Sequence, residues 1–254
     1  MLITSSIVLC LALCGVMLIG FETGFRVGRW RRGEGGDREE MAAVDAAIFA
    51  LLGLLLGFAF AGAMSRLDTR RDLIVKETNA IGTAYLRVDL LPLADQPEMR
   101  RLFRGYLDER LHVFDSLDRG HDAEPAMAAV ARLQREIWTK SVEASRKEAT
   151  GTVERLVLPA LNEMIDVTTT RTVALHTRLP TLILGLLLGV AVLSSLLAGH
   201  AMAKRGRRNY LHAAIYAATV SLTIYAVLDL DDPRRGLIRL EAADQILRQL
   251  HQSM

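Results

Sequence analysis

Four long apolar blocks constrain the fold of this chain more than any other feature of its sequence. They occupy residues 1–21, 44–64, 180–202 and 210–229. Each is close to the roughly 20 residues that a helix needs to cross the hydrocarbon core of a bilayer. Backbone groups in lipid must pair within the segment or within a closed barrel. Barrel strands are about half as long and alternate in polarity. We therefore expect four transmembrane helices.

The charged residues are segregated from these blocks. Hydrophobic residues make up 51% of the 254 residues, while the charges gather in residues 22–43, 65–178, 203–209 and 230–254. The net charge of +2 indicates no nucleic-acid partner. Both cysteines, Cys10 and Cys14, lie in the first block, where we expect small packing residues rather than a disulfide framework. No basic residue precedes that block, so we interpret it as a retained span and not a cleaved signal peptide.

The longest polar segment, residues 65–178, has apolar residues at helical spacing and no strand-like alternation. A heptad pattern extends the second span as a helix that ends at Pro92 and Pro97; its members are Leu67, Ile74, Ile81 and Val88. Gly120 and Gly151 then divide three more amphipathic helices, whose apolar stripes are Met99, Phe103, Tyr106, Val113 and Leu117; Met127, Val130, Leu133, Ile137, Trp138 and Val142; and Val153, Leu156, Val157, Leu161, Met164 and Ile165. The last helix should run into the third span with a kink near Pro159.

Each of these helices must bury one stripe, which favours a bundle. The predicted fold is therefore an all-α membrane protein with four transmembrane helices in two pairs and an inserted helical-bundle domain at residues 65–178. Residues 22–43 and 203–209 are predicted as basic loops, and residues 230–254 as a C-terminal tail.

Two spans carry glycines spaced by four, which places each pair on one helix face: Gly53 and Gly57 in the second span, Gly185 and Gly189 in the third. Such faces allow close approach of another helix. These glycine pairs have two explanations. One is packing within one subunit, and the other is assembly or sliding between spans.

Charges follow the second span directly, and two of them fall on the apolar stripe. Arg70 and Glu77 lie three residues after Leu67 and Ile74. A charge on such a stripe must pair across helices or face water in a shared cavity. Arg66 stands at the end of the span, where it could flank an opening.

An acidic run, Asp229, Asp231 and Asp232, ends the fourth span, where it opposes the helix dipole. Arg234 and Arg235 can neutralise it. A bound cation is the alternative, because hard cations prefer clustered oxygens. No histidine is paired with another at metal-ligand spacing and no catalytic set is recognisable, so we expect no enzyme and no organic cofactor.

The region after residue 50 resembles a known family. Leu51 to Phe60, Arg66, Arg70 and the run from Glu77 to Arg87 (ETNAIGTAYLR) are similar to the bacterial bestrophin-like membrane proteins, as are Asp229 to Asp231 and Gly236 to Arg239. More distantly, Gly57 and Phe58 resemble the second span of the bestrophin anion channels.

This resemblance implies a homo-oligomer in the bacterial inner membrane that conducts inorganic ions, chloride above all. It places Ala50, Leu54 and Phe58 on the pore, with Arg66, Arg70 and Glu77 at its mouth, and it faintly suggests calcium at the acidic run. The alternative function is a membrane sensor or scaffold that signals through its helical domain.

The side of the membrane that the helical domain occupies stays open. The basic residues of the two short loops, at 22–43 and 203–209, favour placing those loops in the cytoplasm. The arginines beside the second span, and the resemblance itself, favour a cytoplasmic helical domain instead.

Overall fold

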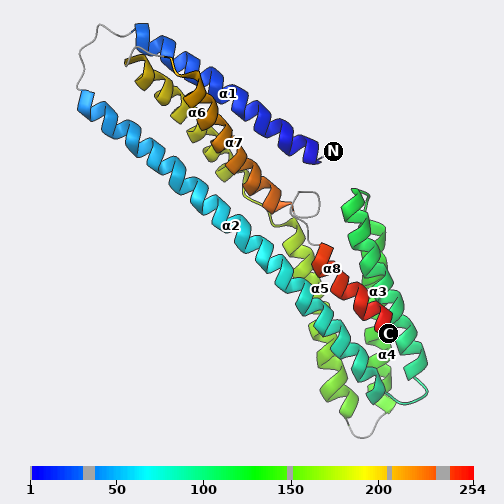
Figure 1. Ribbon diagram of the computed structural model, residues 1–254. Helices are drawn as coiled ribbons and strands as arrows, with labels where there is room; N and C mark the ends of the chain where they lie inside the picture. Colours follow the sequence, from blue (N-terminus) through cyan, green and yellow to red (C-terminus); the bar gives the residue numbers. More distant parts are fainter. Residues whose placement is uncertain (1, 31–37, 148–150, 205–207, 233–240) are drawn as a thin grey trace. The chain divides into compact units, whose positions relative to one another are not determined.

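The computed structural model describes residues 2–30, 38–147, 151–204, 208–232 and 241–254, and all of the regular structure in these ranges is helical. The α-helices are α1 (Leu2–Trp30), α2 (Arg38–Leu86), α3 (Gln96–Arg119), α4 (Glu124–Lys147), α5 (Leu158–His176), α6 (Thr181–Lys204), α7 (Tyr210–Asp231) and α8 (Glu241–Ser253). A 3₁₀ turn (Arg87–Leu90) follows α2 and a π-helical turn (Val153–Val157) precedes α5. Figure 1 shows the chain.

Four helical segments of the described residues are long and apolar enough to cross a membrane. They begin at Ile7, Ala42, Val153 and Tyr210, and the second and third include polar extensions of the spans. The predicted all-helical membrane fold is therefore confirmed. The chain divides into two compact units: unit 1 is Met1–Leu67 with Arg178–Ile238, and unit 2 is Asp68–Thr177 with Arg239–Met254.

In unit 1, helix α1 packs closely against α6, and α7 lies beside α1 (Figure 1). The contact is made by glycines. A Cβ atom at Gly24 would overlap the carbonyl of Leu196, and one at Gly199 would overlap the carbonyl of Phe21. Gly20 and Gly28 extend the same face of α1 toward α6. Only glycine permits two backbones to approach so closely.

In unit 2, Ile81 of α2 and Val88 of the following 3₁₀ turn form one side of the core. These two heptad positions and Ile74 are each at most 1% exposed. The stripes of α3, α4 and α5 cover them, although Leu156 lies outside this core and is 43% exposed. Gly120 ends α3 with a left-handed φ of 73°, as the sequence predicted.

Three boundaries differ from the prediction. Pro97 begins α3 instead of ending the preceding helix, because the first helical turn needs no N–H donor there. Before Pro159 the backbone forms the π turn at Val153–Val157. The fourth bundle helix does not run into the third span, because α5 ends at His176 and the next residue is extended. Pro180 favours such a break by disfavouring helix at the residue before it.

The segment predicted as a C-terminal tail contains helix α8, which belongs to unit 2. Leu247 of α8 is fully buried in the core of that unit. Arg248 pairs with Asp115 on α3 at 2.7 Å, and His251 contacts Asp108 on α3 at 2.7 Å. The prediction missed α8 because the apolar residues of this short segment are few.

Candidate functional site

The three residues assigned to a pore lie on an exposed face of α2 in unit 1. Phe58 is 67% exposed and Leu54 is 55% exposed, and Ala50 is exposed as well. The opposite face of the helix is buried through Leu52 and Ala59. None of these three side chains is buried against another helix of the described residues, and their place on a pore stays a prediction. A bulky apolar stripe instead faces outward along the middle of a span.

The four glycines predicted as packing residues lie on exposed faces too. Around Gly53, Gly57, Gly185 and Gly189 no neighbouring atom of the described chain comes within 4 Å of an added Cβ. The interpretation as packing within one subunit is wrong; the glycines of α1 and Gly199 have that role. Contact between subunits stays a prediction for these four.

At the end of unit 1 where α2 leaves the span, Arg66 contacts the acidic run. Its Nε donates to Asp231 Oδ1 at 2.6 Å, and the other oxygen of Asp231 accepts the backbone N–H of Leu179. Arg178 lies 3.5 Å from Asp232. Arg66 and Arg178 therefore neutralise the acids at the end of α7.

The calcium interpretation of this run is not supported. Across the described residues, no group of three or more His, Cys, Asp or Glu side chains is arranged to hold a metal ion. Asp231 already accepts hydrogen bonds from Arg66 and from the backbone N–H of Leu179. Asp229 accepts a hydrogen bond from the hydroxyl of Tyr225 at 3.3 Å. Arg234 and Arg235, the predicted neutralising residues, lie outside the described residues.

In unit 2, Arg70 is 4% exposed and binds the carboxyl end of α5. Its Nε donates to the carbonyl of Ala174 at 3.2 Å and its Nη2 to the carbonyl of Thr177 at 2.6 Å. These carbonyls lack partners inside the helix, and a guanidinium there also offsets the helix dipole. Arg70 is a buried helix cap, so its assignment to a pore mouth is wrong.

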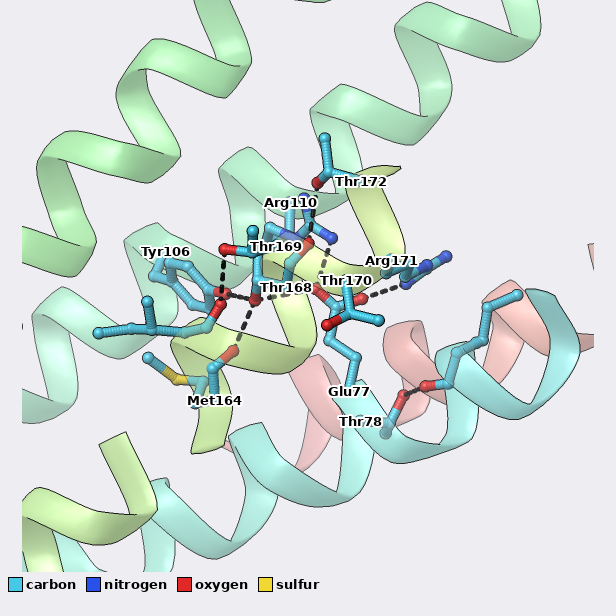
Figure 2. A network of polar contacts seen from close by, with 12 residues as sticks. Glu77, Thr78, Tyr106, Arg110, Met164, Thr168, Thr169, Thr170, Arg171 and Thr172 are labelled. Atoms are coloured by element: carbon cyan, nitrogen blue, oxygen red, sulfur yellow. Dashed lines mark hydrogen bonds and ion pairs between the residues drawn. The ribbon is translucent and has the colours of Figure 1, made fainter. Parts of the chain in front are cut away.

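Glu77 is fully buried at the centre of a polar network in unit 2 (Figure 2). It forms ion pairs with Arg110 of α3 and Arg171 of α5, each 2% exposed. Thr168 donates to Glu77 at 3.3 Å and shares a 2.8 Å hydrogen bond with the hydroxyl of Tyr106. Pairing across helices, one of the two alternatives for this charge, is confirmed. The assignment of Glu77 to a pore mouth is wrong.

An aromatic ring completes the network. The guanidinium carbons of Arg110 and Arg171 lie 4.8 and 3.7 Å from the centroid of Phe114. Burial raises the pKa of the Tyr106 phenol, so its hydroxyl stays protonated and can hydrogen-bond as a neutral group. Breaking a buried ion pair of this kind costs about 3–5 kcal/mol, because the remaining charge is left uncompensated.

The sequence contained a signal for both arginines that the prediction missed. Arg110 falls four residues after Tyr106 and three before Val113, on the apolar stripe of its helix. Arg171 falls seven residues after Met164 on another stripe. The rule that singled out Arg70 and Glu77 applies equally to these positions.

The arrangement of a mostly exposed apolar span followed by a helical bundle can be compared with known proteins. The model of the bestrophin-like domain matches residues 9–244. This chain belongs to the bestrophin-like family. No curated protein sequence matches it.

Solved structures agree with the bestrophin-like fold. A point mutant of a bacterial bestrophin homolog from Klebsiella pneumoniae superposes with a TM-score of 0.72 at 14% sequence identity, covering 98% of this chain and 96% of the other. A second point mutant of that homolog gives a TM-score of 0.70 at 15% identity, covering 94% and 95%. With four apolar spans among its described residues, this bestrophin-like chain is an integral membrane protein.

Proposed function

We propose that this chain is the subunit of an oligomeric ion channel in the bacterial inner membrane, with a pore lined by the exposed face of α2. The observation that carries the proposal is the outward position of Leu54 and Phe58 in mid-span, 55% and 67% exposed in the single chain. Bestrophins are anion channels, and family membership supports the same class of function here.

The apolar side chains of this stripe are suited to form a gate that controls the entry of water into the pore. Rings of Leu54 and Phe58 from several copies would form a narrow apolar constriction. Such a constriction can exclude water, and therefore ions, without a physical plug. Small rearrangements of α2 would wet it and allow conduction.

Assembly is supported by the same helix. Only 17% of the most apolar window of α2 is buried in the single chain, against 33% for each of the other three spans. The open glycine faces at Gly57 and Gly189 would let helices of neighbouring copies approach closely. Lipid covers any part of α2 that another copy does not.

The proposed anion selectivity rests on the family and not on Arg66 or Arg70. Arg70 is buried, and Arg66 is paired with Asp231. The exposed charges farther along α2 include Asp68, Asp72 and Lys76, which are of both signs. Chloride remains the proposed ion.

Planar-bilayer recording of the purified protein tests the proposal. With a tenfold potassium chloride gradient, unitary currents should appear and reverse near the chloride equilibrium potential. Reversal near the potassium potential would overturn anion selectivity but keep the channel. The absence of unitary currents from folded protein would overturn the channel and favour a membrane sensor or scaffold. The unbroken helix α2 (Arg38–Leu86) is the observation that supports this alternative.

A further inference from the structure

One end of unit 1 carries a cluster of arginines that the proposed pore does not use. The cluster lies where α1 ends and α7 begins. It consists of Arg26 and Arg208, which both pair with Glu22, and of Arg29, which follows Arg26 by three residues on α1. Three positive charges and one negative charge give a net charge of +2 for this set. The two chain segments come together because α1 packs along its length against α6 and α7 (Figure 1).

Arg208 is held in place while part of its guanidinium stays open to the outside. It lies 3.5 Å from Glu22, 4.9 Å from the ring centroid of Phe25, and donates to the hydroxyl of Tyr210 at 2.7 Å. Its side chain remains 40% exposed. Glu22 is shared, because it also pairs with Arg26 at 2.9 Å. One carboxylate therefore cannot neutralise both guanidiniums.

The surroundings match the headgroup level of a membrane. Trp30, the last residue of α1, is 86% exposed, and Tyr210, the first residue of α7, is 57% exposed. Exposed Trp and Tyr at the ends of apolar spans are typical of the membrane–water interface. Arg29 is exposed in the last turn of α1, beside Trp30.

We propose that this cluster binds the phosphate of an anionic phospholipid headgroup. Guanidiniums bind phosphate oxygens through paired hydrogen bonds, and basic sites between transmembrane helices recognise such lipids. The acyl chains would lie along exposed apolar side chains of the adjoining spans, among them Val27 and Leu211. The site is independent of the pore on α2.

Native mass spectrometry of the detergent-solubilised protein with added phosphatidylglycerol or phosphatidylcholine tests the proposal. The parent should retain phosphatidylglycerol in preference to phosphatidylcholine. The double variant Arg29→Gln with Arg208→Gln should bind phosphatidylglycerol more weakly, by about fivefold per arginine. Arg132→Gln, which removes an exposed arginine of α4, is the matched control and should bind as the parent does.

Equal retention of phosphatidylglycerol by the parent and the double variant would overturn the site, and so would equal retention of the two lipids by the parent. Displacement of the lipid by millimolar inorganic phosphate would assign the site to a free anion and overturn a lipid site. If the double variant does not fold, the single variant Arg29→Gln decides whether the site exists. The Arg29 side chain is exposed, so its replacement should leave the fold intact.

Discussion

The carboxylate of Glu77 on α2 and the guanidinium of Arg171 on α5 form an ion pair in the interior of unit 2, with the two side chains 0% and 2% exposed. Arg110 of α3 contacts the same carboxylate, so three helices meet at one acidic side chain. Removal of its charge should destabilise the unit more than any surface change.

Glu77→Gln keeps the shape of the side chain but removes the carboxylate that pairs with the buried guanidiniums of Arg110 and Arg171. We expect a loss of about 3–5 kcal/mol in the free energy of unfolding, because uncompensated buried charge is costly. Chemical denaturation in detergent, followed by circular dichroism, measures it. Glu143→Gln on the exposed side of α4 is the control. A loss no larger than that of the control would contradict the assignment.

The phenol of Tyr106 makes stability depend on pH in the alkaline range. Its pKa is raised by burial, so the native state keeps this proton to a higher pH than the unfolded chain does. The stabilisation is complete below the unfolded pKa of about 10 and is lost as the pH rises through the folded pKa. Tyr106→Phe should therefore flatten the fall in stability above pH about 10. Parallel profiles for parent and variant, measured by thermal unfolding, would refute this.

The glycines divide into two classes with different expected effects. Gly24→Leu would overlap the backbone of Leu196 and should unfold unit 1. A Cβ added at Gly57 meets no neighbouring atom of the described residues within 4 Å, so Gly57→Leu should keep the fold and weaken assembly. Light scattering in detergent, together with circular dichroism, distinguishes the two. Unfolding by Gly57→Leu, or a monodisperse monomer from the parent, would contradict the interface at Gly57.

The fold could be predicted from the sequence because the lipid environment and the regular spacing of apolar residues leave few alternative structures. Continuous apolar blocks must be helices, and the heptad from Leu67 to Val88 marks one buried stripe, each member of which is at most 1% exposed. The helix break after His176 was missed, because the effect of Pro180 on the preceding residues is local and was outweighed by the apolar pattern.

The polar contacts could not be assigned in the same way. Arg66 contacts Asp231, which lies 165 residues away in the sequence. Which acidic residue pairs with Arg66 therefore depends on where α7 ends. The packing glycines of α1 have the same spacing as Gly53 and Gly57, so spacing alone does not tell which face meets another helix of the chain.

Cysteine labelling decides which side of the membrane unit 2 occupies. His121 follows the turn after α3 and is exposed, so a cysteine there is accessible in folded protein. In a background without Cys10 and Cys14, we expect His121→Cys to react with an impermeant maleimide only after cell lysis, because the bestrophin resemblance implies a cytoplasmic domain. Labelling of intact cells would place the domain outside, as the two basic loops suggest.

We infer that the exposed apolar stripe of α2 gates a pore. Chloride efflux from proteoliposomes, compared between the parent and Phe58→Ala at equal protein content, tests it most directly. Phe58 is 67% exposed in the chain, so its truncation should not incur the roughly 3–5 kcal/mol that a buried phenylalanine would lose. We predict faster efflux from the variant, since a smaller side chain lets water into the constriction. Equal efflux from both proteins, or none from either while both remain folded, would contradict the account.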